Sequence, residues 1–191
     1  QKYINGFDSS VMAGWSCHTK LDGFALLPVQ SMGQAATTFV GQNIGAKKPE
    51  RALQGIRTAL GLGIAFMICL GFCMYFSAPW LVSLFSRDAA VIELGAAVLR
   101  MVACSEPFYG VSLVIEGMLQ GAGKTTVPFL FNVLGMWGVR ITGTFLFLRL
   151  GSGTLIAAWG CMIAHNLLLF TLYVIYYSRG RWDPLRTGSF G

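Results

Sequence analysis

Residues 154–177 indicate the fold of this chain before any motif is considered. They read TLIAAWGCMIAHNLLLFTLYVIYY and contain no Asp, Glu, Lys or Arg. A helix rises about 1.5 Å per residue, so about 20 apolar residues are enough to cross the hydrocarbon core of a bilayer. The stretch therefore predicts a transmembrane helix, and the other segments have to be placed relative to the same membrane.

Four further apolar segments precede this stretch, at about residues 11–41, 52–76, 89–119 and 127–148. Of the 191 residues, 54% are hydrophobic and only 12% are charged. A soluble domain carries about 25% charged residues, because its surface faces water. We therefore predict an all-α fold, a polytopic membrane bundle of about five transmembrane helices.

The basic residues lie between these segments and alternate between the two sides of the membrane. The side that follows the first, third and fifth segments holds Lys47, Lys48, Arg51, Arg57, Lys124, Arg179, Arg181 and Arg186, and the other side holds Lys2, Lys20, Arg87 and Arg149. Because Lys and Arg accumulate on the cytoplasmic side, we predict a multi-pass protein of the cell membrane with a cytoplasmic C-terminus. The net charge of +6 then reflects topology, and we expect no nucleic-acid partner.

The stretch EGMLQGAGKTT, residues 116–126, partly resembles a phosphate-binding loop. That motif requires a glycine five residues before its Gly-Lys pair, where this chain has Met118, and it should follow a buried strand. We predict instead a tight cytoplasmic turn between two membrane helices. In this interpretation Gly121 and Gly123 supply the backbone freedom that ends one helix, and Pro128 lies in the first turn of the next.

Three phrases of the sequence resemble one family of transporters. They are TKLDGFALLPVQSMGQA (19–35), TFVGQNIGAKKPERA (38–52) and SEPFYGVSLVIEGMLQGAGKTTVPF (105–129). Their order and spacing are similar to the second six-helix lobe of the multidrug and toxic compound extrusion (MATE) transporters, from the family's eighth helix through its twelfth. From this resemblance we expect residues 1–191 to be the C-terminal transmembrane lobe, as a fragment without the N-terminal lobe and without the first helix of its own lobe.

The resemblance implies a secondary antiporter in which two pseudo-symmetric helix bundles face each other across a central cavity. It would export organic cations or drugs against an inward flow of sodium or protons, with the bilayer and the N-terminal lobe as partners. Two alternatives stay open, a flippase for lipid-linked intermediates and a non-transporting scaffold or truncated partner. We expect no enzyme activity, no metal site and no cofactor beyond the coupling ion, because no HExxH, GxSxG or paired metal-ligand spacing is present.

Ionisable residues inside the apolar segments are the candidates for ion coupling, because an unpaired charge at mid-bilayer costs several kcal/mol. Glu106, Tyr109 and Glu116 fall within a sector of about 80° on one helix, at about 100° per residue. Carboxylates on such a face bind a hard cation or exchange a proton. We predict these three residues and Asp22 as coupling residues. Alternatively, Glu106 pairs with Arg100 and Glu116 is a solvated residue near the cytoplasmic turn.

A second group of residues is predicted to line the substrate cavity: Gln30, Gln34, Phe108, Trp137, Arg140 and His165. Aromatic rings stack on flat organic cations, although most aromatic side chains in such a chain contact lipid or the core. The two glutamines are equally suited to contacts between helices. For Arg140 we expect a structural or gating partnership with a glutamate, and His165 is either a proton relay or a hydrogen-bonded packing residue.

Overall fold

The computed structural model describes the backbone of residues 9–149, 155–180 and 182. Within these ranges the side chains of residues 9–18, 21, 22, 25, 147–149 and 155–158 are excepted. The prediction for the Asp22 side chain therefore lies outside the described residues.

Each of the five predicted segments is helical. The elements are α1 (Ser9–Gly45), α2 (Pro49–Ser83), α3 (Ala89–Gly121), the continuous run of α4 (Thr126–Val133), η2 (Leu134–Ile141) and α5 (Thr142–Arg149), and finally α6 (Leu155–Ser178). Proline begins α2 and Glu50 lies in its first turn, where the missing proline N–H costs nothing and the acidic side chain complements the helix dipole. The prediction of an all-α helix bundle is confirmed.

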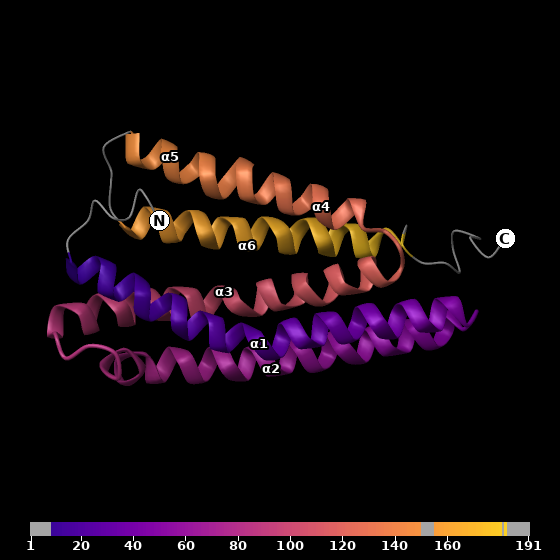
Figure 1. Cartoon of the computed structure of the whole chain (residues 1–191), viewed down its shortest axis with the longest axis horizontal. Helices are drawn as coiled ribbons and strands as arrows, with labels where there is room; N and C mark the ends of the chain where they lie inside the picture. The colour runs from indigo at the N-terminus through magenta and orange to yellow at the C-terminus, as the bar shows by residue number, and fades with distance from the viewer. Residues whose placement is uncertain (1–8, 150–154, 181, 183–191) are drawn as a thin grey trace.

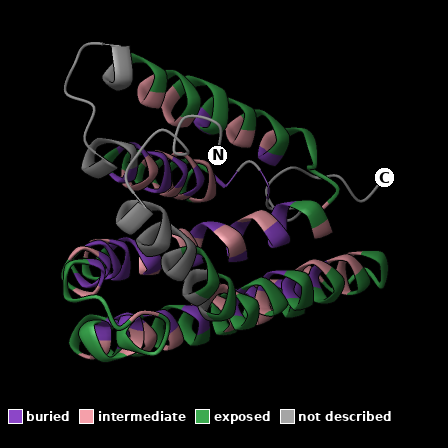
Figure 2. Ribbon diagram, turned by 60° about the vertical axis from the view of Figure 1, so that its left-hand side comes forward, coloured by how far each residue is buried: buried purple, intermediate pink, exposed green. Residues whose placement is uncertain are grey.

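Helix α3 forms the centre of the bundle. It packs against α1 and α2 on one side and against α6 on the other, while the α4–α5 run lies outermost beside α6 (Figure 1). The burial pattern agrees, because α3 carries many buried residues whereas Pro128 and Gly135 are the buried residues described in α4 and η2 (Figure 2). A helix enclosed in this way needs no fully apolar surface.

Three of the described helical stretches are long and apolar enough to cross a membrane, Pro49–Ser83, Thr126–Leu146 and Trp159–Ser178. Helix α3 is not among them, and it carries Glu93, Arg100, Glu106 and Glu116. Its neighbours cover much of its length, and they bury Glu106 and half-bury Glu116, whereas Glu93 and Arg100 are exposed. The central helix is thus the place where polar chemistry inside the bundle is concentrated.

Two apolar clusters hold α3 to its neighbours. Toward the α3–α4 turn, Ile115 and Met118 of α3 pack with Tyr173 of α6 and with residues of α1 and α2. Toward the other end of the bundle, Leu99 of α3 packs with Met74 of α2. The polar residues of α3 lie along a helix that is fixed by apolar contacts near both ends.

The predicted turn between residues 121 and 126 is confirmed, with one correction. Gly123 has a φ of 75°, and the Lys124 N–H donates to the Leu119 carbonyl at 2.8 Å, which closes the end of α3. Gly121, by contrast, is the last residue of α3 and is not among the positive-φ residues. A Cβ there would lie 2.4 Å from the Thr37 carbonyl oxygen, so this glycine serves the contact with α1 and not the turn.

Helices α1 and α3 approach each other closely where small residues meet. A Cβ on Gly117 would lie 2.1 Å from the carbonyl oxygen of Gly33, so the two backbones touch. The Thr37 hydroxyl donates to the Gly117 carbonyl at 2.9 Å and links the helices directly. Small residues and hydroxyl groups are the usual means of close packing between membrane helices.

Candidate functional site

Glu116 lies where α3 meets α4 and α6, and three neutral donors hold its carboxylate. The Asn132 amide donates to Oε1 at 3.2 Å, and the Tyr173 hydroxyl donates to Oε2 at 3.2 Å. The Gln120 amide, one turn further along α3, also donates to Oε1 at 3.2 Å. The side chain is half-buried, so the alternative of a freely solvated glutamate near the turn does not describe it.

The short α3–α4 turn explains why these groups meet. Because α4 runs back beside the end of α3, Asn132 returns to the level of Glu116. Its amide also donates to the Pro128 carbonyl at 3.0 Å, which restrains the side chain. Tyr173 is fully buried, and its ring meets Phe131 edge-on with centroids 5.2 Å apart. Asn132 and Tyr173 are therefore held beside the carboxylate by their own contacts, whereas Gln120 is exposed.

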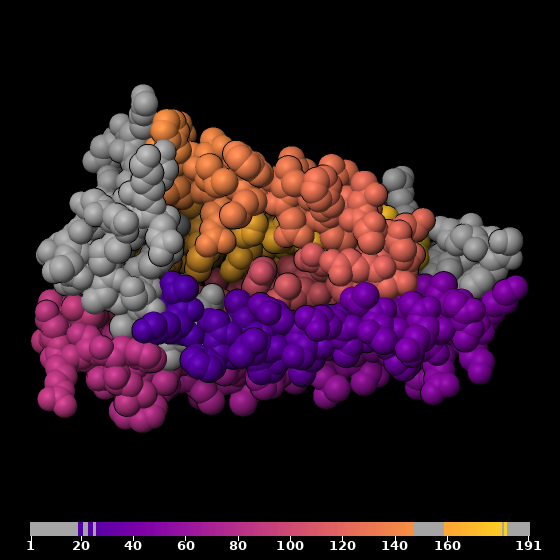
Figure 3. Space-filling view, in the orientation of Figure 1, coloured from indigo at the N-terminus to yellow at the C-terminus, as the bar shows by residue number. Residues whose placement is uncertain are grey.

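A small cavity lies on the α1 side of Glu116. It measures about 170 Å³ and is lined by Gln30, Gln34 and Thr37 of α1 and by Glu116 and Gln120 of α3. The surface is hollowed between α1 and the α4–α5 run, with α3 at the bottom of the hollow (Figure 3). The structure thus brings together Gln30, Gln34 and Glu116, which the sequence suggested separately.

This arrangement leaves the charge of Glu116 available for a cation. The hydrogen bonds that the structure describes at its carboxylate come from two amides and a phenol, and none comes from Lys or Arg. Hard cations prefer oxygen ligands, and the glutamine side chains in the cavity add carbonyl oxygens to the carboxylate. The same carboxylate can instead take up a proton.

Glu106 occupies a separate position on the same helix. It is only 2% exposed, and ten residues separate it from Glu116, which is about 15 Å along a helix axis. The contacts described for Arg100 are with Tyr75, where Nε donates to the carbonyl at 3.4 Å and the guanidinium lies 5.8 Å from the ring. The alternative of a Glu106–Arg100 pair thus finds no support in the Arg100 contacts.

Arg140 and His165 lie at the interface between η2 and α6, away from the cavity beside Glu116. Arg140 contacts the Met162 sulfur at 3.7 Å and not a glutamate. The buried imidazole of His165 lies against Gly135, where a Cβ would be 2.6 Å from Nδ1. Residues 134–141 form a π-helical segment at this point, and the Thr142 hydroxyl bonds to the carbonyl of Trp137, five residues earlier. Such segments are rare and are frequent at functional sites.

The predicted aromatic residues are divided between the surface and the bundle. Trp137 is 64% exposed, and Phe108 is 38% exposed with its ring edge-on to Phe170 at 5.1 Å. Tyr109 is half-buried and packs on the apolar cluster that contains Tyr173, on the side of α3 that faces the site. Phe108 and Trp137 are thus not among the residues that line the cavity beside Glu116.

Asn132 and Tyr173 are the site residues that the sequence interpretation missed. Both donors are neutral, whereas the residues predicted for ion coupling are ionisable. Asn132 interrupts the apolar run 127–139, and an amide placed inside a membrane segment is a signal for a partner on another helix.

Comparison with protein families gives a match between residues 2–146 and the family model described as MatE. The probable multidrug resistance protein NorM of Thermotoga maritima is 24% identical over 171 residues, which are 90% of this chain and 37% of that protein. The multidrug resistance protein NorM of Burkholderia vietnamiensis is 34% identical over 136 residues, or 68% of this chain and 29% of that protein. The chain thus spans well under half the length of these relatives.

Solved structures agree with the fold. The MATE transporter ClbM in complex with Rb⁺ superposes with a TM-score of 0.82 at 22% sequence identity. The superposition covers 96% of this chain and 44% of the transporter. At this identity the match establishes the arrangement of the helices.

Proposed function

The chain belongs to the MatE family of integral membrane transporters, and on this premise we propose that it forms one lobe of a cation-coupled antiporter. The substrates are organic cations or drugs, exported in exchange for inward sodium or protons. The cavity would form between this lobe and an N-terminal lobe of the same protein, since such transporters bind substrate at the interface of their repeats. The C-terminus lies in the cytoplasm, on the side of the α3–α4 turn.

The observation that carries this proposal is the Glu116 site. A carboxylate within the bundle accepts hydrogen bonds from three neutral donors and faces a cavity that three glutamines also line. Intramembrane acidic residues are costly and mark ion or proton pathways. The relatives are named as multidrug resistance proteins, and one transporter of the same fold is described in complex with an alkali cation, which supports a monovalent coupling ion.

Coupling follows from competition for one carboxylate. When Glu116 holds sodium or a proton, its charge is neutralised and a cationic substrate gains little from it. When the ion leaves, the exposed charge attracts the substrate and stabilises the conformation that takes it up. Because Asn132 and Tyr173 belong to α4 and α6, a change in the charge of Glu116 alters contacts between three helices at once.

The test uses the full-length gene product in proteoliposomes. Efflux of a fluorescent organic cation is compared under a sodium gradient, a proton gradient and neither, for the wild type, Glu116→Gln and Glu106→Gln. Glu93→Gln is the matched control, because Glu93 is an exposed acidic residue of the same helix. We expect Glu116→Gln to abolish gradient-dependent efflux and Glu93→Gln to retain it.

Three results would contradict the proposal. Wild-type efflux in Glu116→Gln would remove this residue from coupling. Loss of gradient-dependent efflux in Glu106→Gln but not in Glu116→Gln would assign coupling to the buried Glu106 carboxylate. If the wild type shows no gradient-dependent efflux, antiport itself is wrong, and movement of a lipid-linked intermediate becomes the function to assay.

A further inference from the structure

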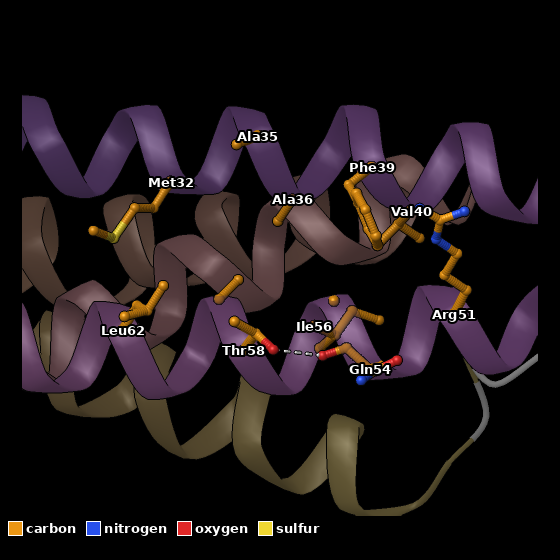
Figure 4. A pocket seen from close by; sticks show the side chains of 12 residues that line it. Met32, Ala35, Ala36, Phe39, Val40, Arg51, Gln54, Ile56, Thr58 and Leu62 are labelled. Atoms are coloured by element: carbon orange, nitrogen blue, oxygen red, sulfur yellow. Dashed lines mark hydrogen bonds between the residues drawn. The ribbon is translucent and has the colours of Figure 1, made fainter.

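A second and larger cavity lies between α1 and α2, away from the Glu116 site. It measures about 470 Å³, within the range of ligand pockets, and it opens along the surface of the bundle. Side chains of both helices point into it (Figure 4). Most of its wall is apolar, with Met32, Ala35 and Phe39 on α1 and Leu62 on α2.

The polarity of this groove changes along its length. Arg51 and Gln54 lie at one end, whereas Met32 and Leu62 lie at the other (Figure 4). Thr58 adds no free donor to the wall, because its hydroxyl donates to the Gln54 carbonyl at 3.0 Å. The groove therefore has one cationic end, and the rest of its wall is apolar. Such a groove is complementary to an amphiphile with one anionic end.

The length of the groove matches one leaflet of a bilayer. Eleven residues separate Arg51 from Leu62, which corresponds to about 16 Å along a helix. Half of a hydrocarbon core of about 30 Å is about 15 Å. An acyl chain that begins at the level of Arg51 would thus reach about the bilayer midplane at Leu62.

The polar end of the groove lies at the basic end of the bundle. Lys47, Lys48, Arg51 and Arg57 are all exposed around the α1–α2 turn, and Glu50 is the acidic residue among them. This turn lies at the same end as the α3–α4 turn with Lys124 (Figure 1). Clusters of four or more basic residues beside a membrane helix attract anionic lipid headgroups.

From the shape, length and charge of this groove we propose that it binds one anionic phospholipid of the leaflet on the basic side. The phosphate of the headgroup contacts Arg51, with Gln54 as a neutral donor beside it. One acyl chain lies along Met32, Ala35, Phe39 and Leu62. The bound lipid fills the space between α1 and α2 and ties the stability of this helix pair to the lipid composition of the membrane.

Native mass spectrometry of the purified full-length gene product tests this proposal. Phosphatidylglycerol and phosphatidylcholine with identical acyl chains are titrated separately. We expect tighter binding of phosphatidylglycerol, and in Arg51→Gln a loss of about fivefold in its affinity, as one near-surface cation contributes about 1 kcal/mol. Arg57→Gln is the matched control on the same helix, since Arg57 is exposed but does not line the groove.

A second pair of variants tests the acyl site. Ala35→Trp places a large ring in the groove and should lower phosphatidylglycerol affinity at least as much as Arg51→Gln. Ala65→Trp, at an exposed position of α2 outside the groove, should not. Inorganic phosphate at the lipid concentration should not displace the lipid, because it has no acyl chain.

Four outcomes would overturn the proposal. Equal losses in Arg51→Gln and Arg57→Gln would mean diffuse attraction to the basic surface and no defined site. Equal affinity for phosphatidylglycerol and phosphatidylcholine would show that the groove does not recognise the charge of the headgroup. Displacement by inorganic phosphate would indicate an anion site without an acyl chain. Unchanged lipid binding in Ala35→Trp, together with a lower melting temperature, would mean that another part of the protein covers the groove.

Discussion

The contact between Gly117 and Gly33 gives the sharpest prediction about stability. A Cβ on Gly117 would lie 2.1 Å from the Gly33 carbonyl oxygen, where 3.4 Å is the lower limit of ordinary contact. The obstacle is backbone, so no side-chain rotation relieves it. In Gly117→Ala the helices α1 and α3 have to separate by about 1.3 Å at this point, the difference between those two distances.

The expected cost combines three contributions. Overpacking a tight contact costs about 1–3 kcal/mol. The separation also stretches the bond from the Thr37 hydroxyl to the Gly117 carbonyl, now 2.9 Å, and loses about 1 kcal/mol. Against this, replacing glycine by alanine within a helix gains about 1 kcal/mol. The net destabilisation is about 2 kcal/mol, which corresponds to about 4–8 °C in melting temperature when this lobe of 191 residues unfolds as one unit.

Thermal unfolding of the purified full-length gene product in detergent measures this effect. Gly61→Ala is the matched control, because Gly61 also lies inside a long helix but has nothing within 4 Å of the added Cβ. It should unfold at the wild-type temperature or slightly above it. If both variants melt together, the close approach of α1 and α3 is not a determinant of stability, and the reasoning from backbone contact fails.

Two further predictions concern the neighbouring helices. Tyr173→Phe removes the phenolic hydrogen bond to the Glu116 carboxylate and should lower gradient-driven efflux about tenfold, since hydrogen bonds to charged groups contribute about 1.5–3 kcal/mol. Tyr176→Phe is the control, because the Tyr176 ring packs on Phe131 at 6.1 Å, and this variant should transport normally. Equal efflux rates in the two variants would contradict the role of the Tyr173 hydroxyl. Gly135→Ala drives a methyl group to 2.6 Å from the buried His165 ring and should lower the melting temperature by several degrees, as overpacking costs about 1–3 kcal/mol. Gly138→Ala is the control and should leave the melting temperature unchanged, because nothing lies within 4 Å of the added Cβ. An unchanged melting temperature in Gly135→Ala would show that the His165 ring moves aside freely.

The sequence predicted the components of the site better than their arrangement. Intramembrane polarity selected Glu116, Gln30 and Gln34, and the structure places all three on one cavity. The same criterion selected His165 and Arg140, which lie at a different interface, where Arg140 contacts Met162 of α6 and His165 lies against Gly135 of η2. The distance between two residues along one helix can be calculated from their residue numbers. Which side of a helix contacts a neighbouring helix cannot be calculated in this way.

The sequence by itself determined the number of long helical segments and their approximate positions, although α2 extends to Ser83, seven residues beyond its predicted end. Long apolar runs have to satisfy their backbone groups internally within a membrane, and helices do this without any partner. Pro49 and Gly123 marked chain turns, because their backbone limits act locally, whereas Pro28, Pro79 and Pro107 lie inside helices. Only the tertiary structure decided that α3 is the central helix, that Asn132 and Tyr173 hold Glu116, and that Gly121 serves packing. These features depend on how helices rotate and approach each other, and that is set by side-chain fit between segments far apart in the chain.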